Sequence, residues 1–242
     1  MCRMLLAIGE FNISKIIDSF LLMANDQNET HERHLIFEKG TFKHKDGWGA
    51  AYLDETGNWR MIRSILPIFE DKRIIELKDI KTNLLILHAR KASQGKIAVD
   101  NCHPFKFKEW VFCHNGGINE TIKFNDDYKP KGDTDSERLF YSLLTDINKN
   151  PQIDKTVRTN IAKYKENPEA NIVLANKNYS YVYLNKNDKI NYYQMKFLKE
   201  KNQLIISSEV LLGIGINWKK LKQEDFVTVD NKTLEININS NG

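Results

Sequence analysis

Runs of apolar residues alternate with polar turn clusters along the chain, and their spacing predicts strands and helices. Three continuous apolar runs, residues 4–8, 83–88 and 110–114, are typical of strands buried on both faces of a sheet. Residues 50–53 and 59–65 alternate more weakly and flank a Glu-Thr-Gly-Asn turn cluster, which indicates a hairpin. Strands buried on both faces require further layers of structure above and below them.

Helical spacing recurs in four segments. Residues 13–23 repeat Ile, Phe and Leu at intervals of three and four, with Ser14 as a candidate cap, and residues 71–77 also look helical. Residues 135–147 form an amphipathic pattern. A further helix is expected over residues 154–164, capped by its first residue, an aspartate.

The last third of the chain predicts mainly strands. They are expected over residues 170–175, 179–184, 190–195, 204–207, 226–229 and 234–238. No composition shift, linker or repeat divides the chain, so we expect one domain over residues 1–242. Many strands with two main helical blocks favour an α+β fold, with sheets and helices in separate layers.

Composition narrows the class of protein. The chain has 242 residues, of which 41% are hydrophobic and 28% charged, which is too apolar for a disordered chain. No apolar run reaches the length that spans a membrane, and residues 1–10 lack the apolar core and cleavage site of a signal peptide. We therefore expect a cytoplasmic protein that does not contact a membrane.

Charge and cysteine content exclude further classes. The net charge is +4, but lysines are interleaved with acids and no run of five like charges occurs, which favours a solvated surface over a nucleic-acid interface. Three cysteines in a chain of this length do not form a disulfide framework. Closely spaced thiol pairs, which a zinc site requires, are also missing, so we expect no metal and no cofactor.

Two segments could supply nucleophilic chemistry. Removal of Met1 would give Cys2 a free α-amine, with a pKa of about 8, beside its thiol, so that one residue provides both base and nucleophile. Taken by itself, Cys2 is better explained as a small buried residue at the start of a strand. Residues 114–117, His-Asn-Gly-Gly, carry an amide and a glycine N–H that could stabilise an oxyanion, although Asn-Gly after an apolar strand by itself predicts a turn.

Two charged residues could hold a substrate with an amino-acid head group. Arg90 leaves a buried strand and could bind a carboxylate through two hydrogen bonds, or pair with a structural acid. Thr134 and Glu137 have the spacing of a capping box, which places Asp135 in the first turn of a helix. There it could hold an ammonium group or simply complement the helix dipole.

Together, and in this order, these segments resemble the class II glutamine amidotransferase domain, an N-terminal-nucleophile hydrolase, and in particular its stand-alone members. The chain begins Met-Cys-Arg, as those proteins do. The later motifs of the family are matched at residues 44–49 (His-x-Asp-Gly-Trp-Gly), 88–93 (His-x-Arg-x-Ala-Ser), 101–105 (Asn-x-His-Pro-Phe), 114–116 (His-Asn-Gly), 132–137 (Gly-Asp-Thr-Asp-Ser-Glu) and 208–209 (Ser-Glu). Each motif is weak alone, but their order is specific. The resemblance implies a four-layer αββα sandwich of two mostly antiparallel sheets.

The resemblance also implies the parts of a thioester mechanism. Cys2 is the nucleophile, and its freed amine is the base. The side-chain amide of Asn115 and the N–H of Gly116 form the oxyanion hole. Cys113 stands where the family commonly has a small residue such as alanine, and should be a buried neighbour. An unprocessed Met1 would block the amine and inactivate the enzyme.

The substrate class follows from the same resemblance. Arg90 binds the α-carboxylate of a glutamyl group, Ser93 helps to hold it, and Asp135 binds the α-ammonium. The implied activity is cleavage of the γ-amide of glutamine. Because we expect no second catalytic domain in the chain, the ammonia would pass to a separate synthase protein. Hydrolysis of a γ-glutamyl amide or peptide, and glutamyl binding without catalysis, are the alternatives.

Overall fold

The computed structural model describes residues 2–164, 170–186 and 188–240. In chain order its elements are β1 (Arg3–Gly9), α1 (Ile13–Ala24), η1 (Glu32–Leu35), β2 (Trp48–Leu53), β3 (Trp59–Ser64), α2 (Ile74–Lys78), β4 (Leu84–Ala89), η2 (Val99–Asn101), β5 (Phe105–Phe107), β6 (Trp110–Gly116), α3 (Asp135–Ile147), α4 (Ile153–Ile161), β7 (Ala170–Ala175), β8 (Tyr179–Leu184), α5 (Ile190–Tyr193), β9 (Lys196–Lys199), β10 (Gln203–Ser207), β11 (Lys219–Lys220), β12 (Asp225–Asp230) and β13 (Ile236–Ser240). The η elements are 3₁₀-helices.

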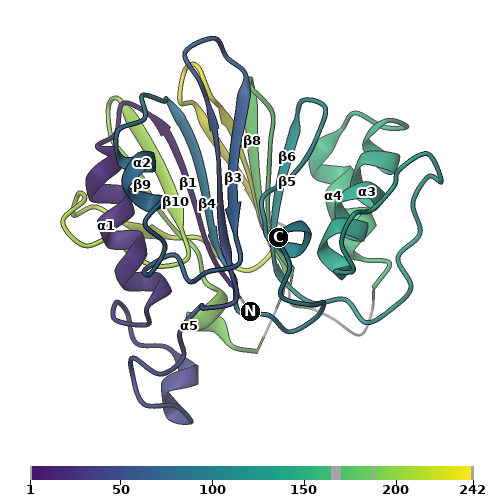
Figure 1. Cartoon of the computed structure of the whole chain (residues 1–242). Coiled ribbons are helices and arrows are strands. Elements are labelled where there is room, and N and C mark those ends of the chain that lie inside the picture. Colours follow the sequence, from purple (N-terminus) through teal and green to yellow (C-terminus); the bar gives the residue numbers. More distant parts are fainter. Residues whose placement is uncertain (1, 165–169, 187, 241–242) are drawn as a thin grey trace.

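Two sheets face each other, and helices cover the outer side of each (Figure 1). The larger sheet has the strand order β11-β9-β10-β1-β4-β2-β3, and the smaller one β13-β12-β8-β7-β6-β5. α1 and α2 pack on the larger sheet, and α3 and α4 on the smaller one. Neighbouring strands pair antiparallel. The α+β prediction of a four-layer αββα sandwich is therefore confirmed.

The strand β1 lies inside the larger sheet, between β10 and β4, and both of its faces are buried. Met4, Leu6 and Ile8 point into the core between the two sheets. Leu5 and Ala7 point to the other side, into the core beneath α1 and α2. Burial of both faces explains why the sequence shows a continuous apolar run here instead of alternation.

The predicted helix caps were wrong at α1 and α4. α1 is capped by Asn12, whose side chain accepts the N–H of Lys15, and not by Ser14. α4 begins after Gln152, which makes no capping hydrogen bond with its side chain. The aspartate predicted to cap α4, Asp154, lies inside the first turn of the helix. Its carboxylate forms an ion pair with the side chain one turn later in the same helix and does not cap the helix start.

The strand predicted over residues 190–195 is also wrong, because most of this segment is the short helix α5. Tyr192 and Tyr193 of α5 are fully buried. The guanidinium of Arg3 lies over the Tyr192 ring at 4.1 Å and donates to the Tyr192 carbonyl at 2.9 Å. No local pattern reveals this contact with a residue at the other end of the chain.

No helix among the described residues combines the length and the apolar character needed to cross a membrane. The expectation of a cytoplasmic location stays a prediction.

Candidate active site

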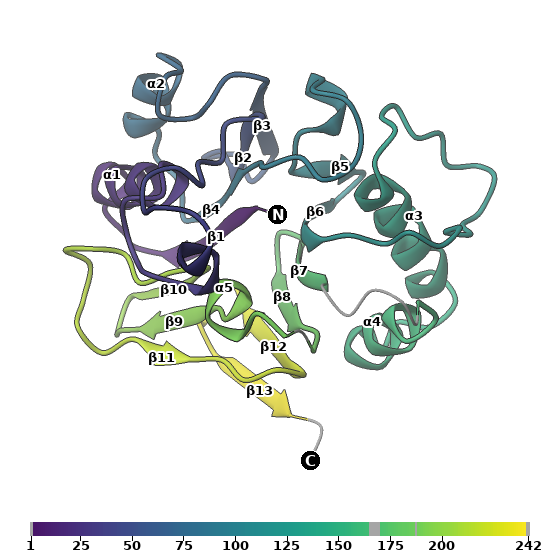
Figure 2. The ribbon, with the colours of Figure 1, turned by 90° about the horizontal axis from the view of Figure 1, so that it is seen from below.

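The first residue of the candidate site, Cys2, directly precedes β1. In Figure 2 the start of β1 points between the two sheets, towards the ends of β6 and β7. The backbone N of Cys2 donates to Oδ1 of Asn115 at 2.6 Å. Two residues that are 113 positions apart in sequence are thus joined across the sandwich, as a shared site requires.

The Asn115 side chain is held in one orientation by this hydrogen bond. Because Oδ1 accepts from Cys2, the amide nitrogen Nδ2 points elsewhere, and it is buried without a hydrogen-bond partner among the described residues.

The predicted Asn-Gly turn was wrong. Asn115 and Gly116 extend β6 and pair with Asn171 and Ala170 of β7. No hairpin forms here, since β7 is reached only after α3 and α4.

The thiol of Cys2 is buried, with Sγ 3.9 Å from the carbonyl of Lys91. Burial acts to raise its pKa. The positive charges at the amino terminus and on His88 outweigh burial and lower the pKa to about 6. Cys113 is buried beside it, as expected, and burial raises the pKa of this second thiol well above its usual value. Of these two thiols, Cys2 is therefore the more readily ionised near neutral pH.

Arg90 is buried, and backbone carbonyls surround its guanidinium. Nη2 donates to the carbonyls of Gln94 at 2.8 Å and Gly95 at 3.3 Å. Nη1 donates to those of Lys96 at 3.2 Å and Asp46 at 3.4 Å. Arg90 therefore fastens the loop that follows β4, a structural role that the sequence did not show. A substrate carboxylate would share the guanidinium with these carbonyls.

The N-terminus of α3 is capped by Thr134, as predicted. Its Oγ1 accepts the N–H of Glu137 at 3.3 Å. The Glu137 carboxylate accepts the N–H groups of Lys131 and Gly132, at 3.0 and 2.7 Å, and so ties down the preceding loop. The helix start is thereby fixed from both sides, which gives the next residue, Asp135, a defined position.

Asp135 is buried, and both of its carboxylate oxygens have partners. Oδ2 accepts the N–H of Ile118 at 2.8 Å, and Oδ1 lies 3.4 Å from the Ser136 hydroxyl. Ile118 also accepts a hydrogen bond from the Gln94 side chain through its carbonyl, at 3.3 Å. Because Arg90 binds the Gln94 carbonyl, Arg90 and Asp135 belong to one hydrogen-bonded frame. Ser93 is exposed in the same loop as Gln94.

The loop at residues 44–49 packs against the end of β4. Asp46 Oδ2 accepts the N–H of Ala92 at 2.8 Å. Gly47 has a φ of 115°, and a Cβ atom there would lie only 2.5 Å from Sγ of Cys102. Glycine is therefore required by both conformation and space. These contacts hold the loop against the residues that follow β4 and against Cys102.

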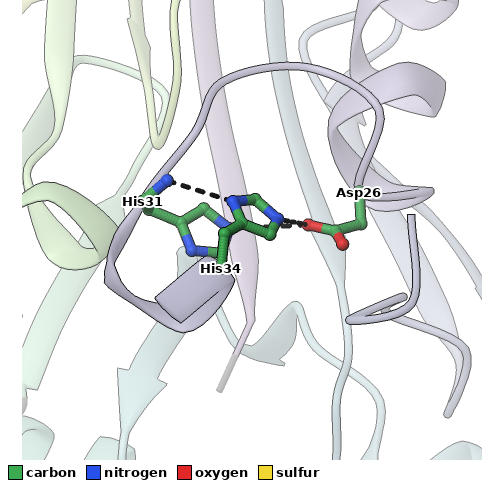
Figure 3. A group of neighbouring side chains, drawn as sticks. All are labelled: Asp26, His31 and His34. Atoms are coloured by element: carbon green, nitrogen blue, oxygen red, sulfur yellow. Dashed lines mark hydrogen bonds and ion pairs between the residues drawn. The ribbon is translucent and has the colours of Figure 1, made fainter. Parts of the chain in front are cut away.

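A cluster that the sequence reasoning missed is formed by Asp26, His31 and His34 (Figure 3). Both Nε2 atoms face Asp26 Oδ1, at 3.5 Å from His31 and 2.9 Å from His34. Each Nδ1 accepts a backbone N–H, His31 from Arg33 at 3.3 Å and His34 from His31 at 3.2 Å. A neutral ring in this arrangement carries its proton on Nε2, which then cannot ligate a metal ion.

The surroundings of this cluster also fit a hydrogen-bonded clamp better than a cation site. Asp26 Oδ2 accepts the N–H groups of Gly40 and Phe42, at 2.8 and 3.0 Å, and so closes the loop between α1 and β2. Burial, and then the nearby positive charge of Arg3, lower the pKa of His31 to about 3. The only sequence signal was the His-x-x-His spacing, which by itself says nothing of the distant aspartate.

Comparison with known proteins identifies the family. Residues 34–224 match the family model of the class-II glutamine amidotransferases, and the chain belongs to this family. YafJ of Escherichia coli, a glutamine amidotransferase by provisional name, is 32% identical over 112 residues, which are 43% of this chain and 44% of YafJ. The chain spans between 34% and 44% of the length of the first curated relatives that it matches.

Solved structures share the fold. A glutamine aminotransferase class-II domain protein from Silicibacter pomeroyi superposes with a TM-score of 0.66 at 16% identity, over 99% of this chain and 100% of that one. Glutamine phosphoribosylpyrophosphate amidotransferase from B. subtilis superposes with a TM-score of 0.62 at 12% identity, over 98% of this chain and 49% of the enzyme. The same sandwich thus occurs as a whole chain and as half of a larger enzyme.

Proposed function

We propose that this chain cleaves the γ-amide of glutamine through a thioester on Cys2. The observation that carries the proposal is the Asn115 amide, which binds the Cys2 nitrogen through Oδ1 and leaves Nδ2 buried and unpaired. A donor that is already oriented and has no partner in the free protein is what an oxyanion hole requires. The N–H of Gly116, the next residue of β6, is the second donor in this proposal.

The reaction balances with the groups present. The thiol proton leaves Sγ of Cys2, and the sulfur attacks the γ-carbonyl carbon while Asn115 and Gly116 hold the oxyanion. The C–N bond then breaks, and the leaving nitrogen takes up a proton and departs as ammonia. Water cleaves the thioester to release glutamate. The α-amine of Cys2, present once Met1 is removed, is the base that moves these protons.

The glutamyl head group is assigned to the frame that joins Arg90 and Asp135. In this proposal Arg90 meets the α-carboxylate, Asp135 meets the α-ammonium, and Ser93 adds a hydroxyl at the exposed side of the same loop. Support comes from the hydrogen bonds through Gln94 and Ile118, which connect the two charges. Glutamine presents one charge of each sign at its head, which this pair matches.

The leaving group distinguishes two forms of this activity. As a glutaminase, the chain would supply ammonia to a separate synthase, and that partner would raise glutamine turnover. As a γ-glutamyl hydrolase, it would act on a γ-glutamyl amide or peptide without a partner. A comparison of kcat/KM for glutamine and for a γ-glutamyl dipeptide, with and without cell extract, separates the two.

Covalent labelling tests the proposal. Native protein is treated with the glutamine analogue diazo-oxo-norleucine, and its intact mass and peptide masses are measured. The expected result is a mass lacking Met1 and one adduct on the Cys2 peptide, formed more slowly when glutamine is present. Retained Met1 without any adduct would contradict the proposal and favour a silent glutamyl-binding module.

A further inference from the structure

A pocket opens at the end of the sandwich opposite Cys2. β1 begins directly after Cys2 and ends at Gly9, which lines the pocket, and a strand of seven residues spans about 20 Å. In Figure 1 the chain start lies at the lower end of the sheets, and the turn between β2 and β3 at the upper end. The pocket encloses about 500 Å³, which is enough for a small organic molecule. It is therefore separate from the proposed glutamine site.

Both sheets contribute to the walls of this pocket. The larger sheet supplies Gly9 at the end of β1, Leu84 at the start of β4 and Lys201 in the turn between β9 and β10. The smaller sheet supplies Lys177 in the turn between β7 and β8, and Lys232 in the turn between β12 and β13. Three turns that are distant in sequence thus each bring one lysine to the same pocket.

Positive charge predominates in the pocket. Of the described residues that line it, Glu10 is the one acid against three lysines. Oε2 of Glu10 accepts a hydrogen bond from the Asn202 amide at 2.9 Å. The ammonium groups of Lys177 and Lys201 form no ion pair or hydrogen bond within the described part of the chain. A cleft lined by charge of one sign attracts and concentrates ions of the opposite sign.

The third lysine, Lys232, also lacks an acid of its own inside the pocket. Its charge acts on Asp230, outside the pocket, whose pKa is lowered chiefly by hydrogen bonds from its own turn. Oδ1 of Asp230 accepts the backbone N–H groups of Lys232 and Thr233, at 2.9 and 2.8 Å. The carboxylate of Asp230 therefore holds the turn, and it leaves the pocket with its excess of positive charge.

The pocket also has an apolar floor. It consists of three leucines, each 7% exposed or less: Leu53, Leu84 and Leu234. Gly9 lies beside them with a φ of 95°, and a Cβ atom there would lie 2.2 Å from the Asn202 carbonyl oxygen. Glycine is therefore required at this position. Asn83 is exposed at the pocket, and its side chain makes no hydrogen bond to any residue that the structure describes.

We propose that this pocket binds a phosphate monoester, with the phosphate among the lysines and the organic group against the leucines. Lysine binds phosphate as a point charge. Three lysines and one glutamate give the pocket a net charge of +2, and a phosphate monoester carries about −1.5 to −2 at neutral pH, which a single carboxylate does not match. The Asn83 amide adds a donor. This inference is independent of the proposed function, because the pocket shares no residue with the proposed glutamine site.

The test is isothermal titration calorimetry with phenyl phosphate, at low ionic strength. Wild-type protein should bind the probe saturably. A double variant with Lys177→Gln and Lys201→Gln should bind it at least about tenfold more weakly, since two charged contacts are lost. The matched control is a double variant with Lys123→Gln and Lys149→Gln, exposed lysines of another pocket of about 600 Å³ beside α3. It loses the same charge and should bind within about twofold of wild type.

Two further titrations define the ligand and the place. Inorganic phosphate should bind at least about fivefold more weakly than phenyl phosphate, because it cannot cover the leucines. Excess glutamine should not compete with the probe. Equal losses in the two double variants would reduce the effect to a general attraction and overturn the inference. Competition by glutamine, or no saturable binding up to about 10 mM probe, would overturn it as well. Inorganic phosphate that binds as tightly as phenyl phosphate would reject the monoester.

Discussion

The side-chain amide of Asn115 allows the most direct test of the site, because its oxygen and its nitrogen have different roles. Asn115→Asp keeps an oxygen for the Cys2 nitrogen, which lies 2.6 Å from Oδ1, but replaces the unpaired Nδ2 with a second oxygen. Loss of one oxyanion donor costs roughly 3–4 kcal/mol, a hundredfold to thousandfold fall in kcat. Asn115→Ala should fall at least as far, since it removes the acceptor as well. The KM for glutamine should change little in both variants.

The assay is glutamate release over a range of glutamine concentrations, with thermal unfolding of each variant as a check on the fold. Asn171→Ala is the matched control, because Asn171 is the buried asparagine paired with Asn115 across β6 and β7, and its amide donates to the carbonyl of Tyr193. It should lower the melting temperature but keep kcat within about fivefold. A rate for Asn115→Asp within about threefold of wild type would refute the assignment of the oxyanion hole.

Three further predictions follow from the same contacts. Cys2→Ser should abolish glutamate release and diazo-oxo-norleucine labelling with the melting temperature unchanged within about 2 °C, and retained turnover would refute the mechanism. Asp135→Asn and Arg90→Ala should each raise the KM for glutamine about tenfold or more, the scale of a charged hydrogen bond, and unchanged saturation curves would remove them from the substrate site. Glu209→Ala leaves the buried guanidinium of Arg3 without its carboxylate partner at 2.6 Å and should lower the free energy of unfolding in urea by about 3–5 kcal/mol; a loss under about 1 kcal/mol would contradict this.

Much of the fold could be predicted because the sandwich imposes strong local patterns. Strands buried on both faces, such as β1 and β6, become continuous apolar runs. The helix α3 was predicted to the residue, since Thr134 marks its start and one apolar face runs its length. The errors arose where contacts between residues far apart in sequence decide the local structure. Tyr192 of α5 packs beneath Arg3, which is distant in sequence, and Asn115 stays in a strand because it pairs with β7, which follows two helices later.

The candidate site was visible in the sequence only as separate residues. The motifs pointed to Cys2 and Asn115, but the hydrogen bond between them spans 113 positions. The bonds from Arg90 to loop carbonyls were also hidden, because an arginine after a strand looks the same whether it binds substrate or backbone.

The burial of residues 2–4 also has a consequence for when Met1 can be removed. Cys2 is 7% exposed, and Arg3 and Met4, which follow it, are 1% and 0% exposed. The strands that enclose them, β4 and β10, end at residues 89 and 207. A processing enzyme needs accessible, locally unfolded chain. Under the proposed mechanism, we therefore expect Met1 to be excised early, before the residues that follow it are enclosed by those strands. Molecules that keep Met1 would lack the free amine of Cys2, and specific activity would then depend on how completely the host removes Met1.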